Sequence, residues 1–208
     1  METPTLTRPS NGASDTAASQ TPAWAHAPFR TAAVLGAGVM GSQIAAHLAN
    51  AGLDVLLLDV TPESIGREGA KNSLVEGAFK GAVKMKPDPF MSAEAQKRVT
   101  LGNFDDDFDL IGEADWIIEV VVERMDVKQE VMERIENAAS DTAVISTNTS
   151  GLPIAQIAEG RSDDFKRRFL GTHFFNPPRY LKLFEVIPTE DTDPDVIDRV
   201  SASISSIV

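Results

Sequence analysis

The stretch that decides the fold runs from Thr31 to Val60 and reads TAAVLGAGVMGSQIAAHLANAGLDVLLLDV. Its first five residues, Thr31–Leu35, form a short apolar run that is typical of a buried strand. The glycines of a G-x-G-x-x-G pattern follow at once, and residues 40–50 then place apolar side chains at helical spacing. A second apolar run ends near Asp59, 18 residues after the third glycine. This order of strand, glycine loop, helix and strand predicts a doubly wound α/β unit.

Each residue of the pattern has a separate task at a bound dinucleotide. We expect Gly36 to permit the tight turn, Gly38 to let the backbone approach a pyrophosphate, and Gly41 to let the helix pack closely on the sheet. The free N–H groups of the helix N-terminus would face the phosphates. Asp59 would accept hydrogen bonds from the adenosine ribose, and its charge would repel a 2′-phosphate, which favours NAD over NADP. The alternatives are a glycine turn without a ligand and a methyltransferase, and Gly41 argues against the second.

Composition excludes several classes of protein. The chain has 208 residues, no cysteine and a net charge of −12, so it offers neither disulfides nor a surface attractive to nucleic acid or anionic membranes. No apolar stretch is long enough to span a membrane. The acidic run FDDDFD (104–109) lacks calcium-loop spacing, so we interpret it as a solvated loop and expect no metal site. The absence of cysteine favours a reducing compartment, and we expect a cytoplasmic location.

The first 28 residues differ in composition from the rest. They are rich in Thr, Ser, Pro and Ala and carry only three charged residues, Glu2, Arg8 and Asp15. Such a segment has no periodic apolar face to bury, so residues 1–28 are predicted to be a disordered tail. Residues 29–208 are then predicted to form one domain.

The middle of the chain predicts two consecutive helices, one from Pro62 to about Met85 and a shorter one from Ser92 to about Val99. Two helices in a row suggest a hairpin that projects from the sheet. Lys80, Lys84 and Lys86 gather on its lower part, either as a solvated face or as a patch for a phosphorylated ligand. The expected fold is therefore Rossmann-type α/β: a mostly parallel sheet with helices on both faces and a projecting helical hairpin.

The second half continues the alternation of strand and helix. Trp116–Val122 is apolar enough to be a central parallel strand, except for Glu119, whose role this pattern leaves open. Glu123 follows it at the sheet edge where ligands bind in α/β folds. Met125–Ala139 predicts a helix, and Thr142–Gly151 predicts a strand that ends in small hydroxyl residues, often mere caps.

A last stretch, GTHFFNPPRYLKLFE (171–185), places His173 at the end of an apolar run and Glu185 12 residues later. One interpretation is a strand, a turn and another strand without further purpose. The other is a general base and the carboxylate that orients it, since histidine titrates near neutral pH. In this second interpretation Phe174 and Phe175 would keep the surroundings of the base dry.

Five motifs, in order, are GAGVMGSQIA, ADWIIEVVVE, STNTSG, THFFNPP and LFEVI. Together they resemble the NAD-binding domain of the L-3-hydroxyacyl-CoA dehydrogenases over residues 30–208. The segment HFFNPPRYLKLFEVIP is most similar to the long bacterial fatty-acid oxidation proteins that carry an enoyl-CoA hydratase unit elsewhere.

The resemblance implies a role for particular residues. His173 matches the catalytic base, Glu185 its partner, and Ser150 the serine that contacts the reacting hydroxyl. Ser73 and Lys80 align more loosely with contacts to the CoA portion of the substrate. The positions expected to bind NAD are Gly36, Gly38, Val39, Met40, Gly41, Asp59, Val121, Val122, Glu123, Lys128, Ser150 and Asn176.

The expected function is the NAD-dependent oxidation of (S)-3-hydroxyacyl-CoA to 3-ketoacyl-CoA in fatty-acid β-oxidation. The alternatives are a non-catalytic NAD-binding structural protein and a small hydroxy-acid dehydrogenase on the same fold. In the family a helical C-terminal domain completes the active site and makes the dimer contact. We therefore expect a fragment that binds NAD but catalyses poorly by itself, and a full-length form that is a homodimer or part of a multifunctional complex.

Overall fold

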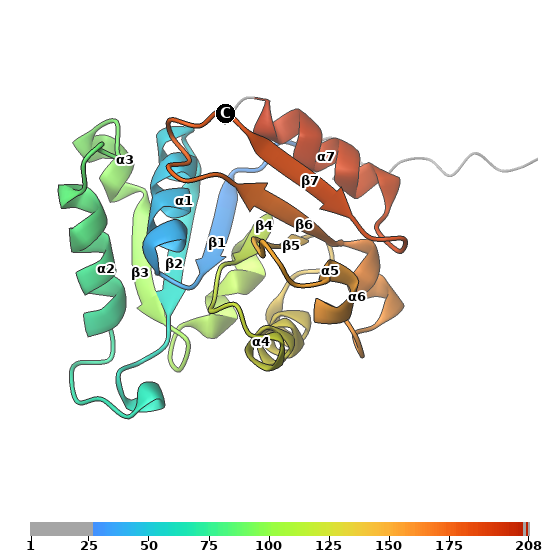
Figure 1. Ribbon diagram of the computed structural model, residues 1–208, viewed down its shortest axis with the longest axis horizontal. Helices are drawn as coiled ribbons and strands as arrows, with labels where there is room; N and C mark the ends of the chain where they lie inside the picture. Colours follow the sequence, from blue (N-terminus) through green and yellow to red (C-terminus); the bar gives the residue numbers. More distant parts are fainter. Residues whose placement is uncertain (1–26, 206, 208) are drawn as a thin grey trace, which may run out of the picture.

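The computed structural model describes residues 27–205 and 207, and a seven-stranded sheet lies at its centre (Figure 1). The strand order is β3-β2-β1-β4-β5-β6-β7, and every neighbouring pair is parallel except β6 with β7. The strands are β1 (Thr31–Leu35), β2 (Asp54–Asp59), β3 (Val99–Asn103), β4 (Trp116–Glu119), β5 (Val144–Thr147), β6 (Phe169–Phe174) and β7 (Phe184–Pro188). The predicted Rossmann-type α/β fold is thereby confirmed.

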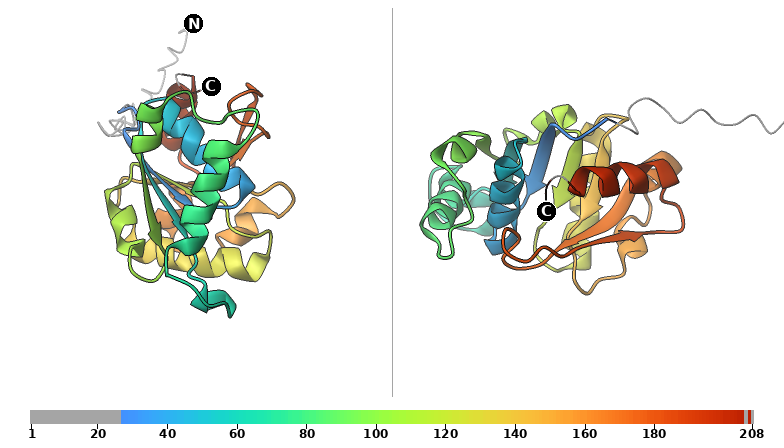
Figure 2. Two further views of the ribbon diagram at one scale, coloured as in Figure 1. Left: turned by 90° about the vertical axis from the view of Figure 1, so that its left-hand side faces the viewer. Right: turned by 90° about the horizontal axis from the view of Figure 1, so that it is seen from above.

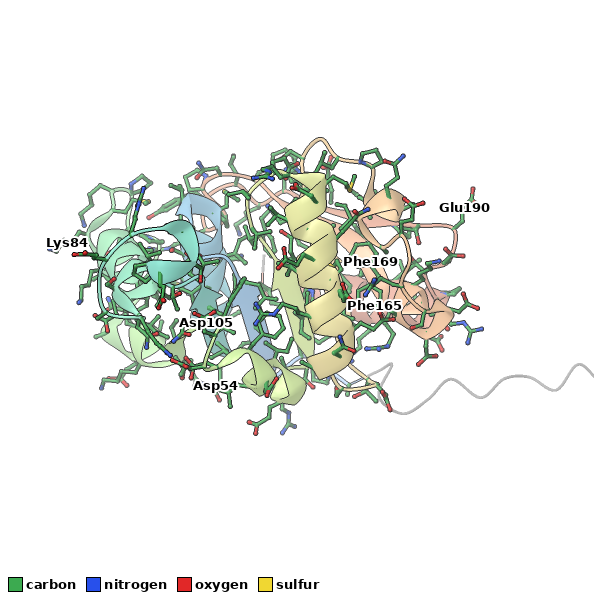
Figure 3. All side chains as sticks on the ribbon, turned by 90° about the horizontal axis from the view of Figure 1, so that it is seen from below. Asp54, Lys84, Asp105, Phe165, Phe169 and Glu190 are labelled. Atoms are coloured by element: carbon green, nitrogen blue, oxygen red, sulfur yellow. The ribbon has the colours of Figure 1, made fainter. Side chains whose placement is uncertain are left out.

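Helices cover both faces of the sheet. One face packs against α1 (Val39–Asn50), α2 (Ser73–Lys84), α3 (Ala93–Lys97) and α7 (Pro194–Ile204). The other packs against the 3-10 helix η3 (Phe108–Glu113), α4 (Met125–Ala138), α5 (Ile154–Ile157) and α6 (Asp163–Arg167). Figure 2 shows α7 lying over the strands at one end of the sheet, with α2 and α3 at the other. In Figure 3 α4 crosses the second face, with Phe165 and Phe169 beside it.

The alternation of side chains along the strands creates two separate apolar layers. Trp116 and Ile118 of β4 belong to the layer under α1, whereas Ile117 belongs to the layer under α4. Because successive residues of a strand point to opposite faces, Glu119 is directed to the α4 side. The same alternation along β6 decides which face of the sheet each of its side chains occupies.

The long helix predicted from Pro62 to Met85 is wrong in its first half. A 3-10 turn, η2 (Glu63–Ile65), follows Pro62, and the chain then forms a loop until α2 begins at Ser73. Gly66 has a φ of 70°, a left-handed backbone that ends any helix begun at Pro62. The glycine therefore outweighs the helix-start signal of Thr61 and Pro62.

The segment around Val99 also differs from the prediction. The short helix α3 ends at Lys97, and Val99–Asn103 forms the edge strand β3, which the sequence pattern did not indicate. The central strand β4 is likewise shorter than predicted and ends at Glu119. An edge strand such as β3 is partly exposed, so its apolar pattern in the sequence is weak. Its parallel pairing with β2 establishes it as a strand.

The two ends of the domain lie close together. Asp193 caps α7, and Val196 and Val200 of this helix are fully buried against the sheet. Arg199 on the same helix donates to the carbonyl of Ala27, and Phe29 stacks on Trp116. Residues 1–26 of the predicted tail lie outside the described residues.

Candidate active site

The glycine loop between β1 and α1 has no space for side chains at two of its three glycines. A Cβ on Gly36 would lie 2.6 Å from the carbonyl oxygen of Val120, and the φ of Gly36 is 106°. A Cβ on Gly41 would lie 1.8 Å from the carbonyl oxygen of Gly36. In contrast, a Cβ on Gly38 would meet nothing within 4 Å. The first and third glycines therefore close the loop, and the second leaves an open approach to the backbone.

The N-terminus of α1 is suited to an anion. Gly38 occupies the cap position, and no side chain of the described residues caps the helix. The first N–H groups of the helix are left for a ligand beside Gly38, where a Cβ would narrow the approach. The pyrophosphate of a dinucleotide fits this cradle.

Asp59 ends β2 beside the same loop. Its carboxylate accepts hydrogen bonds from the backbone N–H groups of Ala37 and Val60, at 3.0 and 2.8 Å. Burial raises the pKa of Asp59, and these two hydrogen bonds oppose that rise. The acid thus holds the glycine loop against β2 while it faces the cleft.

A cleft of about 1180 Å³ extends from Asp59 to Ser150 along the carboxyl ends of the parallel strands. It lies across β1 and β4, where the strand order reverses, which is the usual ligand position in such sheets. The predicted cofactor residues on its wall are Gly36, Gly38, Val39, Met40, Asp59, Val121, Val122, Glu123, Lys128 and Ser150. Sequence reasoning missed Ser64, Ile65, Val127 and Asn148, which also line it. Of these, Asn148 lies in the polar end of the predicted strand 142–151 and could have been found by that position.

The catalytic residues predicted from the sequence come together beside Ser150, the one of the three that is among the residues lining the cleft. In the antiparallel register of β6 and β7, His173 lies directly opposite Glu185. Nδ1 of His173 is 3.1 Å from Oε2 of Glu185, and Nε2 is 3.2 Å from Oγ of Ser150. The His173 side chain is 19 % exposed. The three side chains form a continuous hydrogen-bonded row in which one histidine nitrogen faces the serine and the other faces the carboxylate.

Of the two phenylalanines expected beside the base, only one is there. The ring of Phe175 packs edge-on against His173, with 4.6 Å between centroids. Phe174 points to the opposite face of the sheet and packs on Trp116 and Phe184, because neighbouring strand residues alternate in direction. The expectation for Phe174 was therefore wrong.

Asn176 lies after β6 and is linked to α1. Its Oδ1 accepts a hydrogen bond of 3.3 Å from Nε2 of the buried Gln43. Asn148, after β5, accepts a hydrogen bond from the backbone N–H of Phe174 at 2.9 Å. Both amides tie the end of β6 to neighbouring elements and thereby hold His173 in place.

The two residues expected to contact CoA lie elsewhere. Ser73 and Lys80 are exposed on α2 and are absent from the described lining of the cleft. Nζ of Lys80 forms an ion pair of 3.1 Å with Glu76 on the same helix. A ligand that reaches them from the cleft has to extend along the surface toward α2.

Among the described residues, no helix is long and apolar enough to cross a membrane. Within residues 27–205 and 207, no group of three or more His, Asp or Glu side chains could hold a metal ion.

The glycine loop, the uncapped helix and the cleft at the strand reversal define a dinucleotide-binding domain of the dehydrogenase class. The comparison with known families is more specific. The chain belongs to the family described as 3-hydroxyacyl-CoA dehydrogenase, NAD binding domain, whose model matches residues 31–207. The family confirms NAD as the cofactor.

Curated relatives and solved structures agree with this family. A probable 3-hydroxyacyl-CoA dehydrogenase of Bacillus subtilis is 48 % identical over 188 residues, which cover 85 % of this chain and 24 % of the relative. A putative fatty acid oxidation complex trifunctional enzyme of Rickettsia felis is 38 % identical, over 83 % of this chain and 24 % of its own length. The crystal structure of FadB2 from M. tuberculosis matches with a TM-score of 0.70 and 28 % identity, covering 87 % of this chain and 61 % of that one. The chain thus spans about a quarter of the two curated relatives.

Proposed function

We propose that this chain is the cofactor-binding part of an enzyme that oxidises (S)-3-hydroxyacyl-CoA to 3-ketoacyl-CoA in fatty-acid β-oxidation. The observation that carries the proposal is the row Ser150–His173–Glu185 at one end of the NAD cleft. The names of the Bacillus and Rickettsia relatives support the substrate class and the metabolic role.

The row has the geometry that alcohol oxidation requires. Bound NAD would accept the hydride from the substrate carbon. Nε2 of His173 would take the hydroxyl proton, while the Ser150 hydroxyl, 3.2 Å away, would hydrogen-bond the same substrate oxygen. Glu185, on the other ring nitrogen, would keep Nδ1 protonated and stabilise the imidazolium that forms. Each atom involved in proton transfer is therefore assigned to a residue of this chain.

The remaining roles follow from position. The glycine loop and Asp59 would hold the pyrophosphate and the adenosine ribose, with Val121, Val122 and Asn176 nearer the nicotinamide. Ser73 and Lys80 would contact the CoA portion outside the cleft. The name of the Rickettsia relative supports a multifunctional assembly for a longer form of the protein. A cytoplasmic location and homodimer formation stay predictions.

The proposal is tested by NADH oxidation in the presence of acetoacetyl-CoA, the reverse reaction. In a longer natural form of the protein, His173→Gln should lower kcat by at least ~10², the scale of general-base catalysis, while the affinity for NAD is retained. Near-normal turnover by this variant would overturn the role of His173, and loss of NAD binding would indicate a structural histidine.

Two other outcomes would select the alternatives. Activity with small hydroxy acids but none with acyl-CoA esters would favour a small hydroxy-acid dehydrogenase. NAD binding without any turnover, in this chain and in a longer natural form, would favour a structural protein.

A further inference from the structure

Lys128, which lines the cleft, belongs to a buried ion pair that the proposed chemistry does not use. Glu119 at the end of β4 is 0 % exposed, and Lys128 on α4 is 1 % exposed. Their Oε1 and Nζ atoms are 2.8 Å apart. We propose that Glu119, acting through Lys128 and Glu123, is a positioning residue that fixes the backbone of Ser150 and Gly151 beside His173. The inference rests on the proposed function only for the catalytic role of Ser150.

Glu119 is held rigidly on every side. Its Oε1 also accepts a hydrogen bond from the backbone N–H of Val121 at 2.7 Å. Its Oε2 accepts one from the hydroxyl of Thr147, the residue opposite it on β5, at 2.6 Å. A carboxylate with three partners and no solvent is anchored to the sheet, so it is a fixed point for the lysine.

Lys128 connects this fixed point to a second carboxylate. Its Nζ lies 3.3 Å from Oε2 of Glu123, a side chain that is 45 % exposed at the rim of the cleft. The lysine therefore sits between two carboxylates that would repel each other without it. Its third donor has the carbonyl of Val121 at 3.5 Å, so all three N–H groups have an acceptor nearby.

Glu123 in turn holds the loop after β5. Its Oε1 accepts hydrogen bonds from the backbone N–H groups of Ser150 and Gly151 at 3.1 and 3.2 Å, and one from the Thr149 hydroxyl. Partial burial acts to raise the pKa of Glu123, but these hydrogen bonds and the charge of Lys128 outweigh it and lower the pKa. The direction of Ser150 toward His173 thus depends on an ionised Glu123 held in place by Lys128.

The arrangement of charges predicts that a second substitution, at Glu119, restores the loop contacts that a substitution of Lys128 removes. Lys128→Met alone would leave Glu119 buried without its cation, and its repulsion would drive the exposed Glu123 away from the loop. Glu119→Gln combined with Lys128→Met removes both buried charges, so Glu123 would keep its hydrogen bonds to Ser150 and Gly151. A lysine that served only as a cofactor ligand would show no such dependence on Glu119.

The experiment measures hydrogen exchange of the Ser150 and Gly151 amides in the cofactor-free chain, for the wild type, both single variants and the double variant. Lys128→Met should lower the protection of these two amides at least tenfold, and the double variant should restore it to within about threefold. Glu123→Ala, a change at an exposed side chain, provides the reference for full loss of these hydrogen bonds.

A matched control lies on the same helix. Glu136 of α4 accepts a hydrogen bond from the backbone N–H of Ser162 and pairs with Arg161, and it is not among the residues that line the cleft. Glu136→Gln should leave the Ser150 and Gly151 amides unchanged. Equal protection in Lys128→Met and the wild type, or no recovery in the double variant, would overturn the proposal. Failure of Lys128→Met alone to fold, with a folded double variant that protects both amides, would support it. The measurement needs neither cofactor nor substrate, so it stands apart from the activity assay.

Discussion

The two ends of the cleft are built in different ways. At the cofactor end, residues 31–60 supply the glycine loop, the helix N-terminus and Asp59 from one continuous stretch, and most of the contacts involve backbone atoms. At the end that we propose to be catalytic, Ser150, His173 and Glu185 come from three strand regions and meet through side chains. We therefore expect the first end to be sensitive to added side-chain volume, and the second to the charge and orientation of its side chains.

The largest effect is expected at Gly41, at the end of the cleft that is sensitive to volume. Adding a single methyl group there should strongly destabilise the fold. Gly41→Ala places a Cβ 1.8 Å from the carbonyl oxygen of Gly36, and this neighbour is backbone, so no flexible side chain can move aside to make room. We expect the chain to lose about 3 kcal/mol of stability or more, or not to fold. Urea unfolding followed by circular dichroism measures this loss.

Gly38→Ala is the control from the same loop. With no atom within 4 Å of the added Cβ, its stability should change by less than about 0.5 kcal/mol, while NAD binds more weakly. Equal stability losses in both variants would show that the loop does not separate packing from ligand approach.

The next effect concerns charge at the catalytic end. Glu185→Gln keeps the shape of the side chain but removes the carboxylate that faces Nδ1 of His173. In a longer natural form of the protein, the rate of NADH oxidation with acetoacetyl-CoA should fall about 10²-fold, because the imidazolium loses its stabilisation, and NAD affinity should stay unchanged. Glu190→Gln, at an exposed site past β7, is the matched control and should have wild-type activity (Figure 3). Wild-type rates in Glu185→Gln would remove this residue from the mechanism.

A third prediction contrasts His173 with His47, the other histidine of the described residues. His47 is 7 % exposed on α1, and its Nε2 has no hydrogen-bond partner among them. Burial, together with the charge of Arg179, lowers the pKa of His47 to about 4 from its ordinary value of 6.5. Below pH 6.5 the unfolded chain therefore binds more protons at this site than the folded chain, so stability falls as pH decreases toward 4.

The expected loss from His47 between pH 7.5 and pH 5 is about 2 kcal/mol. His47→Leu should remove that part of the pH dependence, whatever its own effect on stability at pH 7.5. Denaturant unfolding of both chains at the two pH values measures the difference. Parallel pH profiles for the wild type and the variant would contradict a neutral, buried His47.

The smallest effect is expected at the cofactor end, from Asp59→Ala. Loss of the carboxylate should weaken NAD about tenfold, the scale of one or two lost hydrogen bonds to a charged group, and reduce the preference over NADP. Fluorescence titration with both cofactors measures the change. Asp54→Ala, at the other end of β2, should leave both affinities unchanged (Figure 3). Tighter binding of NADP than NAD by the unmutated chain would refute the assignment of Asp59.

The sequence by itself predicted the strand, glycine loop, helix and acidic residue of the proposed cofactor end. Gly36, Gly38, Gly41 and Asp59 could be assigned because their tasks involve neighbouring backbone and a ligand, and such local geometry is written in residue spacing. The helix α7 was predictable for the same reason, since a cap at Asp193 and a periodic apolar face are local signals. The motif resemblance added His173, Glu185 and Ser150 as expectations, but it gave no distances between them.

Only the tertiary structure decided which side chains meet at the catalytic end. The register of β6 and β7 sets His173 against Glu185, and strand parity sends Phe174 to the opposite face. In the sequence, Glu119 is an unexplained exception in an apolar strand. In the structure, it pairs with Lys128 of α4 and accepts a hydrogen bond from Thr147 of β5. Pairing between distant segments fixes these contacts, and neither propensity nor spacing along the chain records which segments pair.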